Sequence, residues 1–192
     1  MSDPATTAGS APRVFVVSGP TAVGKGTVVA CLKRLHPEVF VSVSATTRPP
    51  RPGEVEGVHY HFVDDVTFDD LVAHDGLLEW AVVHGRHRYG TPRAEVERAV
   101  EQGRVVVLEI DLQGAEQVRR TYPQACQVFI DPPDWDELVR RLVGRGTETP
   151  EQQARRLETA RRELALAEGF DHRVTNREVD QTVADLVGLF GL

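Results

Sequence analysis

Residues 19–27 read Gly19-Pro20-Thr21-Ala22-Val23-Gly24-Lys25-Gly26-Thr27 and decide the fold. A short apolar run rich in β-branched residues, 13–18, precedes this stretch, and a helical pattern follows it. The order of strand, glycine-rich turn and helix is the setting of a phosphate-binding loop. Gly19 and Gly24 allow the backbone to curl so that successive N–H groups point at phosphate oxygens. Lys25 adds a full positive charge beside the positive end of the helix.

The residue after the lysine departs from the usual phosphate loop. Gly26 stands where Ser or Thr normally offers a hydroxyl to magnesium. We therefore expect Mg²⁺ to be held mainly through water and the oxygens of the nucleotide, with no direct ligand from the protein. Thr27 remains available to a phosphate. This Gly-Lys-Gly-Thr form resembles the loop of adenylate kinases, and the lysine at a fixed offset argues against a chance glycine-rich turn.

Length and charge narrow the class of protein. The chain has 192 residues and a formal net charge of −7, which suits one domain and argues against a general binder of nucleic acid or membrane surfaces. No apolar run approaches the length of a membrane span. Cys31 and Cys126 lie in apolar segments without a CxxC spacing, which favours core roles. Residues 1–12 are small and polar, unlike a signal peptide, so we expect a disordered tail and a cytoplasmic protein.

A proline-rich loop carries a second set of candidate anion contacts. Residues 41–47 alternate as a strand and lead into Arg48-Pro49-Pro50-Arg51-Pro52-Gly53-Glu54. The prolines exclude a helix and stiffen the loop. Arg48 and Arg51 on so rigid a segment suit a doubly charged phosphate. An isolated pair of this kind would be interpreted as solvated surface arginines, but serine and threonine hydroxyls lead into the same loop.

A carboxylate stands inside an apolar strand further along the chain. Residues 77–83 read Leu-Leu-Glu-Trp-Ala-Val-Val, and a carboxylate there is costly unless it is paired. Glu79 is therefore a candidate to accept hydrogen bonds from a ligand. Thr91 precedes Pro92, and this order predicts that Thr91 caps the next helix. Residues 59–63 are expected to form another strand.

The second half of the chain adds acids and arginines. Residues 105–111 form an apolar run that ends in acid, as a central parallel strand does, and such acids lie beside the phosphate loop. Asp111 could therefore orient the water shell of magnesium or contact a base, and Glu109 is a weaker candidate on the metal side. Thr149-Pro150-Glu151-Gln152 is a capping box that predicts the start of a long helix.

Together these motifs resemble those of guanylate kinases. The resemblance runs through Ser44-Ala45-Thr46-Thr47-Arg48-Pro49-Pro50-Arg51-Pro52-Gly53-Glu54, then Tyr60, Leu78-Glu79-Trp80 and Tyr89-Gly90-Thr91-Pro92, all downstream of the phosphate loop. It implies a nucleoside monophosphate kinase that transfers the γ-phosphoryl group of ATP to GMP, and to dGMP, giving ADP and GDP with Mg²⁺ in purine nucleotide metabolism. The implied partners are these small molecules, and no nucleic acid or membrane is expected as a partner. We expect the protein to be a monomer or a homodimer.

The resemblance also assigns residues. ATP would be bound by Gly19, Pro20, Thr21, Ala22, Val23, Gly24, Lys25, Gly26 and Thr27, and by Asn176 near the adenine. The GMP site would contain Ser44, Arg48, Arg51, Tyr60 and Tyr89 around the phosphate, and Glu79, Thr91 and Asp111 near the guanine. The catalytic residues would be Lys25, Arg48, Arg145 and Arg156. The turn before Tyr89 is one residue longer than the usual turn of the family.

The alternation of strands and helices predicts an α/β three-layer P-loop kinase fold with a mostly parallel central sheet. We expect a tail at 1–12 and one kinase domain at 13–192, made of a core (13–44, 99–144 and 159–192), a GMP-binding insertion (45–98) and a small lid (145–158). Two alternatives remain. A non-catalytic scaffold domain of the same family would lack a working phosphate loop, and a P-loop kinase for a sugar phosphate would have no base for Glu79 to read.

Overall fold

The computed structural model describes residues 13–83, 85–143 and 149–192, so the predicted tail at 1–12 and Arg145 lie outside it. The elements are β1 (Val14–Ser18), α1 (Lys25–Leu35), β2 (Phe40–Val41), β3 (Ala45–Thr46), β4 (His61–Phe62), α2 (Asp65–Ala73), β5 (Leu77–Val83), β6 (His87–Pro92), α3 (Arg93–Glu101), β7 (Val106–Glu109), α4 (Leu112–Thr121), β8 (Cys126–Asp131), α5 (Trp135–Val143), α6 (Pro150–Ala165), β9 (His172–Thr175) and α7 (Val179–Phe190). A short 3₁₀ turn, Ala167–Gly169, follows α6. Strands and helices alternate through most of the chain, as the apolar patterns predict.

The central sheet has five strands in the order β2-β7-β1-β8-β9. Every pairing in this sheet is parallel, which confirms the predicted parallel sheet. β1 lies in the middle, and all five of its residues are buried. Because both neighbours of β1 are strands, the loop that follows it leaves from the centre of the carboxyl edge of the sheet, where ligands bind in α/β folds.

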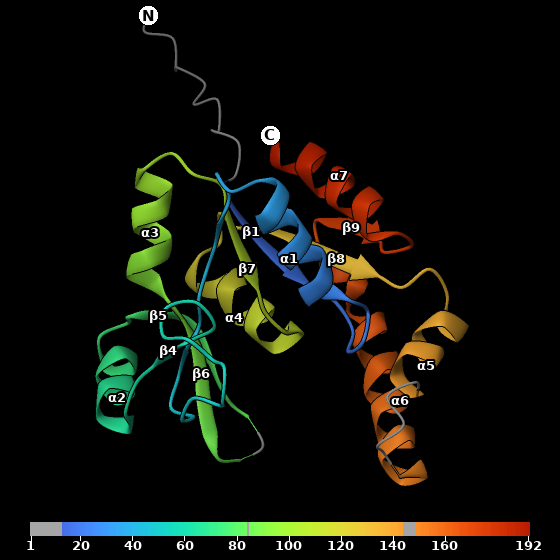
Figure 1. Cartoon of the computed structure of the whole chain (residues 1–192), viewed down its shortest axis with the longest axis horizontal. Coiled ribbons are helices and arrows are strands. Elements are labelled where there is room, and N and C mark those ends of the chain that lie inside the picture. The colour runs from blue at the N-terminus through green and yellow to red at the C-terminus, as the bar shows by residue number, and fades with distance from the viewer. Residues whose placement is uncertain (1–12, 84, 144–148) are drawn as a thin grey trace, which may run out of the picture.

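Three layers follow from the side-chain alternation of β1. Phe15 and Val17 point to one face, where they join a core with α1, α5 and α7. Val14 and Val16 point to the other face and pack with α3 and α4. Successive side chains of a strand face opposite sides of a sheet, and a strand buried on both faces is therefore apolar throughout. The predicted three-layer α/β fold is confirmed, and Figure 1 shows the helices on the two sides of the sheet.

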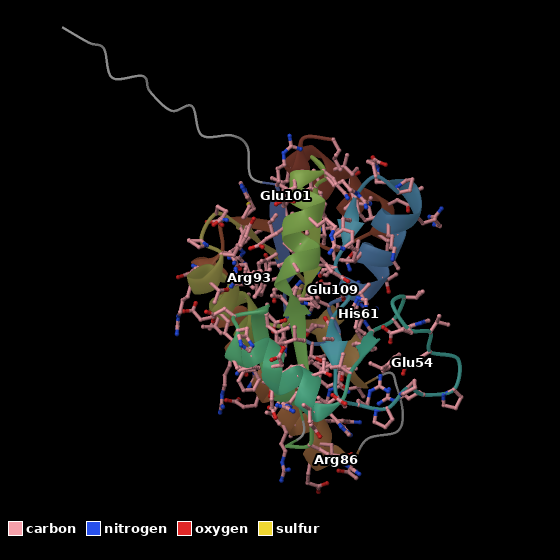
Figure 2. The ribbon with its side chains drawn as sticks, turned by 90° about the vertical axis from the view of Figure 1, so that its left-hand side faces the viewer. Glu54, His61, Arg86, Arg93, Glu101 and Glu109 are labelled. Atoms are coloured by element: carbon pink, nitrogen blue, oxygen red, sulfur yellow. The ribbon has the colours of Figure 1, made fainter. Side chains whose placement is uncertain are left out.

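A second sheet of four strands, in the order β4-β3-β6-β5, lies at one end of the molecule with α2 (Figure 1). It has a small core of its own, built around Ala45, Phe68 and Leu77. Arg88 of β6 fastens α2 to this sheet through bonds to the carboxylates of Asp65 and Asp69. Figure 2 shows Arg86 close to the tip of the β5–β6 hairpin, far from Glu101 at the end of α3.

The strand predicted at 41–47 is wrong as one element, because its two ends belong to different sheets. Phe40 and Val41 pair with β7 of the central sheet. Ala45 and Thr46 pair with β4 and β6 of the second sheet. The chain crosses between the sheets within 42–44, and one alternating pattern therefore serves two separate short strands.

The strand predicted at 59–63 is also shorter than expected. Only His61 and Phe62 form β4. The imidazole Nδ1 of His59 accepts a hydrogen bond from the N–H of Val55 at 3.0 Å, and Gly57 donates its N–H to the carbonyl of Tyr60. These contacts fold 55–60 into a turn and remove it from the sheet.

The second sheet is fixed to the central core through α4. Gln117 of α4 exchanges two hydrogen bonds with the backbone of Trp80, and Thr121 donates its hydroxyl to the carbonyl of Leu78. Leu78 itself is fully buried in the core on the α3–α4 side. Strand β5 therefore belongs to both cores and positions Glu79 between them.

Helix α6 starts as the capping box predicts. Thr149 accepts a hydrogen bond from the N–H of Gln152, and the side chain of Gln152 accepts one from the N–H of Thr149. Figure 1 shows α5 and α6 projecting on the side away from the second sheet. None of the helices in the described part of the chain is long and apolar enough to cross a membrane.

We expect Phe15→Ala to lower the free energy of unfolding by about 3–5 kcal/mol, since it removes a buried aromatic ring from the central strand. Phe15 is 1% exposed, and its ring centroid lies 4.2 Å from that of Phe190. Urea unfolding measures this loss. Val66→Ala is the control, because Val66 is 77% exposed on α2, and equal stabilities of the two variants would contradict the assignment of this core.

Candidate active site

The loop between β1 and α1 has the backbone geometry that a phosphate requires. Gly19 has φ 152° and Gly24 has φ 99°, and Ala22 also has a positive φ, of 64°. A Cβ on Gly19 would lie 2.4 Å from the carbonyl oxygen of Ile130, so no larger residue fits against β8. The first N–H groups of α1 have no partner within the helix and face the loop. The curled loop followed by a helix N-terminus is an anion-binding site.

Three side chains hold this loop. Sequence reasoning did not single out two of them, and it assigned the third to another role. The carbonyl of Val23 accepts hydrogen bonds from Arg141 Nη1 at 2.9 Å and from Asn176 Nδ2 at 2.8 Å. The N–H of Thr21 donates to Glu163 Oε2 at 2.8 Å. Sequence reasoning missed Arg141 and Glu163, because charged residues are frequent on both of their helices and no local pattern distinguishes these two.

Lys25 lies inside the loop. Its Nζ donates to the carbonyl oxygen of Gly19 at 2.6 Å. Burial lowers the pKa of the Lys25 amino group below its ordinary value, and this is the largest effect on it. The negative charges of Glu109, Glu163 and Asp111 oppose the shift. Lys25 is a cation held where the outer phosphates of a nucleotide would meet it.

Arg48 is the centre of a second cationic cluster on the second sheet. Its guanidinium makes two hydrogen bonds to Glu54, at 2.8 and 2.9 Å, and one to the hydroxyl of Tyr89 at 3.0 Å. The bonds from Arg48 and from the N–H of Arg51 hold the pKa of the Glu54 carboxyl down at about 2. Sequence reasoning did not give Glu54 a role. It orients the arginine, which is 8% exposed.

Aromatic rings line the same cluster. The Arg48 guanidinium carbon lies 5.3 Å from the centroid of the Tyr60 ring, and the rings of Tyr60 and Tyr89 meet edge to face at 5.6 Å. The structure therefore brings together three of the residues predicted for the GMP phosphate. Arg51 is exposed on the adjoining loop, and Ser44 lies between β2 and β3, where its carbonyl accepts the N–H of His61.

Glu79 and Thr91 form a buried pair. The Thr91 hydroxyl donates to Glu79 Oε1 at 2.7 Å, and the two residues are 0% and 8% exposed, in that order. Burial raises the pKa of the Glu79 carboxyl to about 7, the charge of Asp111 adds to the rise, and the bond from Thr91 opposes it. This carboxyl is a strong acceptor with few partners in the protein, which is the property of a group that awaits donors from a ligand.

One predicted role at this end of the site is wrong, and one residue has a structural role that the sequence did not predict. Thr91 does not cap α3: it lies in β6, and Pro92 is the N-cap residue. The buried carboxylate of Glu79 takes its hydroxyl, because an unpaired charge there would be more costly than an uncapped helix end. Asp111 caps α4 by accepting the N–H of Gly114 at 2.8 Å. A Cβ on Gly114 would approach Glu79 Oε2 to 3.0 Å, so α4 forms a wall of the Glu79 site.

The remaining predicted residues that the structure describes lie in α1, directly after β9 and in α6. Thr27 is exposed in the first turn of α1, and Asn176 is buried directly after β9. Arg156 lies on α6. Arg145 lies outside the described residues.

The residues beside Gly26 suit a hydrated magnesium ion. A Cβ on Gly26 would lie 3.4 Å from Glu109 Oε1, so a carboxylate occupies the side of the loop where a hydroxyl is missing. Oxygen donors of this kind are the ones that Mg²⁺ prefers, and it keeps several of its waters. Within the described part of the chain no group of three or more His, Cys, Asp or Glu side chains could hold a metal by itself. This donor set fits a metal held mainly by water and nucleotide.

The parallel sheet with this loop defines a P-loop kinase. The family model for guanylate kinase matches residues 11–190. Guanylate kinases from Cutibacterium acnes and Leifsonia xyli are 66% and 59% identical over 93% and 92% of this chain, and over 90% and 70% of their own lengths. A crystal structure of guanylate kinase from Anaplasma phagocytophilum superposes with a TM-score of 0.71 at 32% identity, covering 95% of this chain and 86% of that one. The chain belongs to the guanylate kinase family.

The raised pKa of Glu79 predicts how stability depends on pH. Between the ordinary carboxyl pKa and about 7, the folded protein keeps a proton that the unfolded chain releases, so stability falls as the pH rises through this window. In Glu79→Gln this loss disappears. From about pH 5 to about pH 8, the free energy of unfolding of the variant should therefore rise by about 2–3 kcal/mol relative to that of the unsubstituted protein. Urea unfolding at both pH values measures it, and parallel pH profiles would contradict a buried, titrating Glu79.

Proposed function

We propose that the protein transfers the γ-phosphoryl group of ATP to GMP, and also to dGMP, giving ADP and the nucleoside diphosphate. The observation that carries this substrate is the buried pair of Glu79 and Thr91 on the same small sheet as the Arg48 cluster. A carboxylate accepts from both N1–H and the 2-amino group of guanine. Adenine offers neither donor in that geometry, so it would leave the buried carboxyl of Glu79 without a partner.

The phosphate of GMP is the nucleophile and requires no general base, because it is already largely a dianion near neutral pH. We assign its binding to Arg48 and Tyr89, with Arg51, Tyr60 and Ser44 completing the site. The bidentate contact of Arg48 with Glu54 supports this assignment, since the same guanidinium fork that fits a carboxylate fits a phosphate. Glu54 also fixes the fork in advance, which lowers the entropy lost on binding.

The phosphate loop would hold the donor. Its N–H groups and Lys25 cradle the outer phosphates of ATP, and the charge on Lys25 stabilises the phosphoryl group in transfer. We assign the same role to Arg145 and Arg156. Glu109 and Asp111 would orient the water shell of magnesium, and the ion would supply positive charge to the phosphates of ATP. The reaction is then an in-line transfer that depends on positioning and charge alone.

We further propose that the second sheet moves relative to the central core when the substrates bind, together with the lid at 145–158. The separate small core of Ala45, Phe68 and Leu77 supports a unit that moves as one body. Val96 and Ala99 of α3 pack on the central sheet, so the hinge lies near the start of α3. Closure would exclude water and protect ATP from hydrolysis. We expect this cycle to occur in the cytoplasm, in a monomer or homodimer.

An assay of ADP formation with Mg²⁺–ATP and each of GMP, AMP, UMP and CMP tests the reaction. Rapid turnover is expected with GMP alone. Lys25→Ala should lower kcat by at least about 100-fold, because it removes a cation from the transferring phosphates. Lys33→Ala should not, since Lys33 is exposed on the same helix. A folded protein that binds GMP and turns over none of the four substrates would be a scaffold domain and would overturn the proposal.

The reading of the base has its own test. Glu79→Gln should lower kcat/KM for GMP by about 100-fold with a much smaller effect on AMP, because an amide cannot accept from both guanine donors at once. Glu97→Gln is the matched control, since Glu97 is an exposed carboxylate on α3. If the ratio of GMP to AMP turnover stayed the same in Glu79→Gln, another residue would read the base.

A further inference from the structure

The carbonyl oxygen of Val23, inside the phosphate loop, is held by two donors from distant parts of the chain. Arg141 reaches it from α5 and Asn176 from the end of β9, at 2.9 and 2.8 Å. Val23 is fully buried and Asn176 is 3% exposed. A carbonyl with two such donors is well satisfied and has a fixed direction, because turning it away would leave both donors without this acceptor.

Asn176 is itself fixed in place. Its backbone N–H donates to the carbonyl of Asp131 at 2.8 Å, and its side-chain Oδ1 lies 3.1 Å from the hydroxyl of Thr182, which is fully buried. The amide nitrogen is therefore the end that faces Val23. A Cβ on Gly24 would lie 2.8 Å from that nitrogen, so the side chain fills the space directly behind the loop.

The direction of the Val23 carbonyl sets the direction of the next N–H. The described peptide bonds are all trans, and in a trans peptide the C=O and the following N–H point in opposite directions. Holding the Val23 oxygen toward Asn176 and Arg141 thus turns the N–H of Gly24 the other way, into the concave side of the loop. Gly24 has φ 99°, a conformation that glycine adopts readily. A flipped peptide would instead present an oxygen to the incoming phosphate.

We propose that Asn176 is a positioning residue, which together with Arg141 fixes the Val23–Gly24 peptide so that the Gly24 N–H binds a nucleotide phosphate. The inference rests on the proposed role of the loop as the ATP phosphate site. It differs from the adenine contact that sequence resemblance implies for Asn176. An adenine contact would affect only ligands that carry the base. The two hydrogen bonds from Asn176 and Arg141 to the Val23 carbonyl, called the brace below, would affect any polyphosphate, with or without a base.

Inorganic tripolyphosphate separates the two roles, because it has the phosphates of ATP and no adenine. We expect Asn176→Leu, which keeps the volume and removes the donor, to weaken tripolyphosphate and Mg²⁺–ATP by the same factor, about 5–10-fold. Titration calorimetry measures both affinities. Gln181→Ala is the control, an exposed amide on the neighbouring helix α7 that should change neither. Loss of ATP affinity with unchanged tripolyphosphate affinity would assign Asn176 to the adenine and overturn the proposal, as would no loss at all.

Arg141→Lys is the second variant, which keeps the positive charge and loses the planar guanidinium fork of a partly exposed side chain. It should give the same parallel loss. The amide resonance of Gly24 in a ¹⁵N spectrum is a direct readout: its shift on adding tripolyphosphate should shrink in both variants, and a full shift would contradict the brace. GMP affinity, which should be unchanged, shows that each variant is folded. If the unsubstituted protein bound tripolyphosphate but did not phosphorylate GMP, the proposed function would fail and the brace would stand.

Discussion

The structure depends on one constraint: the loop after β1 must keep several backbone N–H groups free of protein partners and turned to one side. Such a loop has little stability of its own, since buried polar groups without partners are costly. Neighbouring elements therefore hold its outer side. Ile130 of β8 leaves room only for Gly19, Glu163 of α6 takes the N–H of Thr21, and two donors take the Val23 carbonyl. Four elements that are distant in sequence meet there because β1 is the central strand.

In both halves of the site a cation lies beside carboxylates. Around the loop, the amino group of Lys25 lies near acidic side chains. On the second sheet, the guanidinium of Arg48 already donates hydrogen bonds to Glu54 and Tyr89. Both arrangements keep a cation ordered before an anionic ligand arrives. The phosphates of the ligand must then compete with the carboxylates for the same cation. Glu79 is the reverse case, a carboxyl whose burial raises its pKa. In the proposed function, charge binds the phosphates and the buried carboxyl reads the base, so affinity and selectivity would come from different residues.

Much of this was predictable from the sequence, where local patterns determine the outcome. The loop, the parallel strands, the capping box of α6 and Glu79 in an apolar strand each follow from a few neighbouring residues. The failures are non-local. The chain at 41–47 changes sheets without a break in its alternation, and Thr91 pairs with Glu79 twelve positions away and not with α3. Arg141 and Glu163 are found only when the fold brings their helices to the loop.

Glu79 and the phosphate loop are linked by a short chain of contacts. Glu79 lies against Gly114, where a Cβ would come within 3.0 Å of its oxygen. Gly114 donates its N–H to Asp111, which lies two residues after the end of β7. β7 pairs with β1, and β1 leads into the loop. Two residues of the Arg48 cluster lie outside this chain of contacts, because Arg48 follows β3 and Tyr89 lies in β6. Glu79 and Tyr89 both lie on the second sheet, so a movement of that sheet would carry the residues proposed for the base and for the phosphate of GMP together.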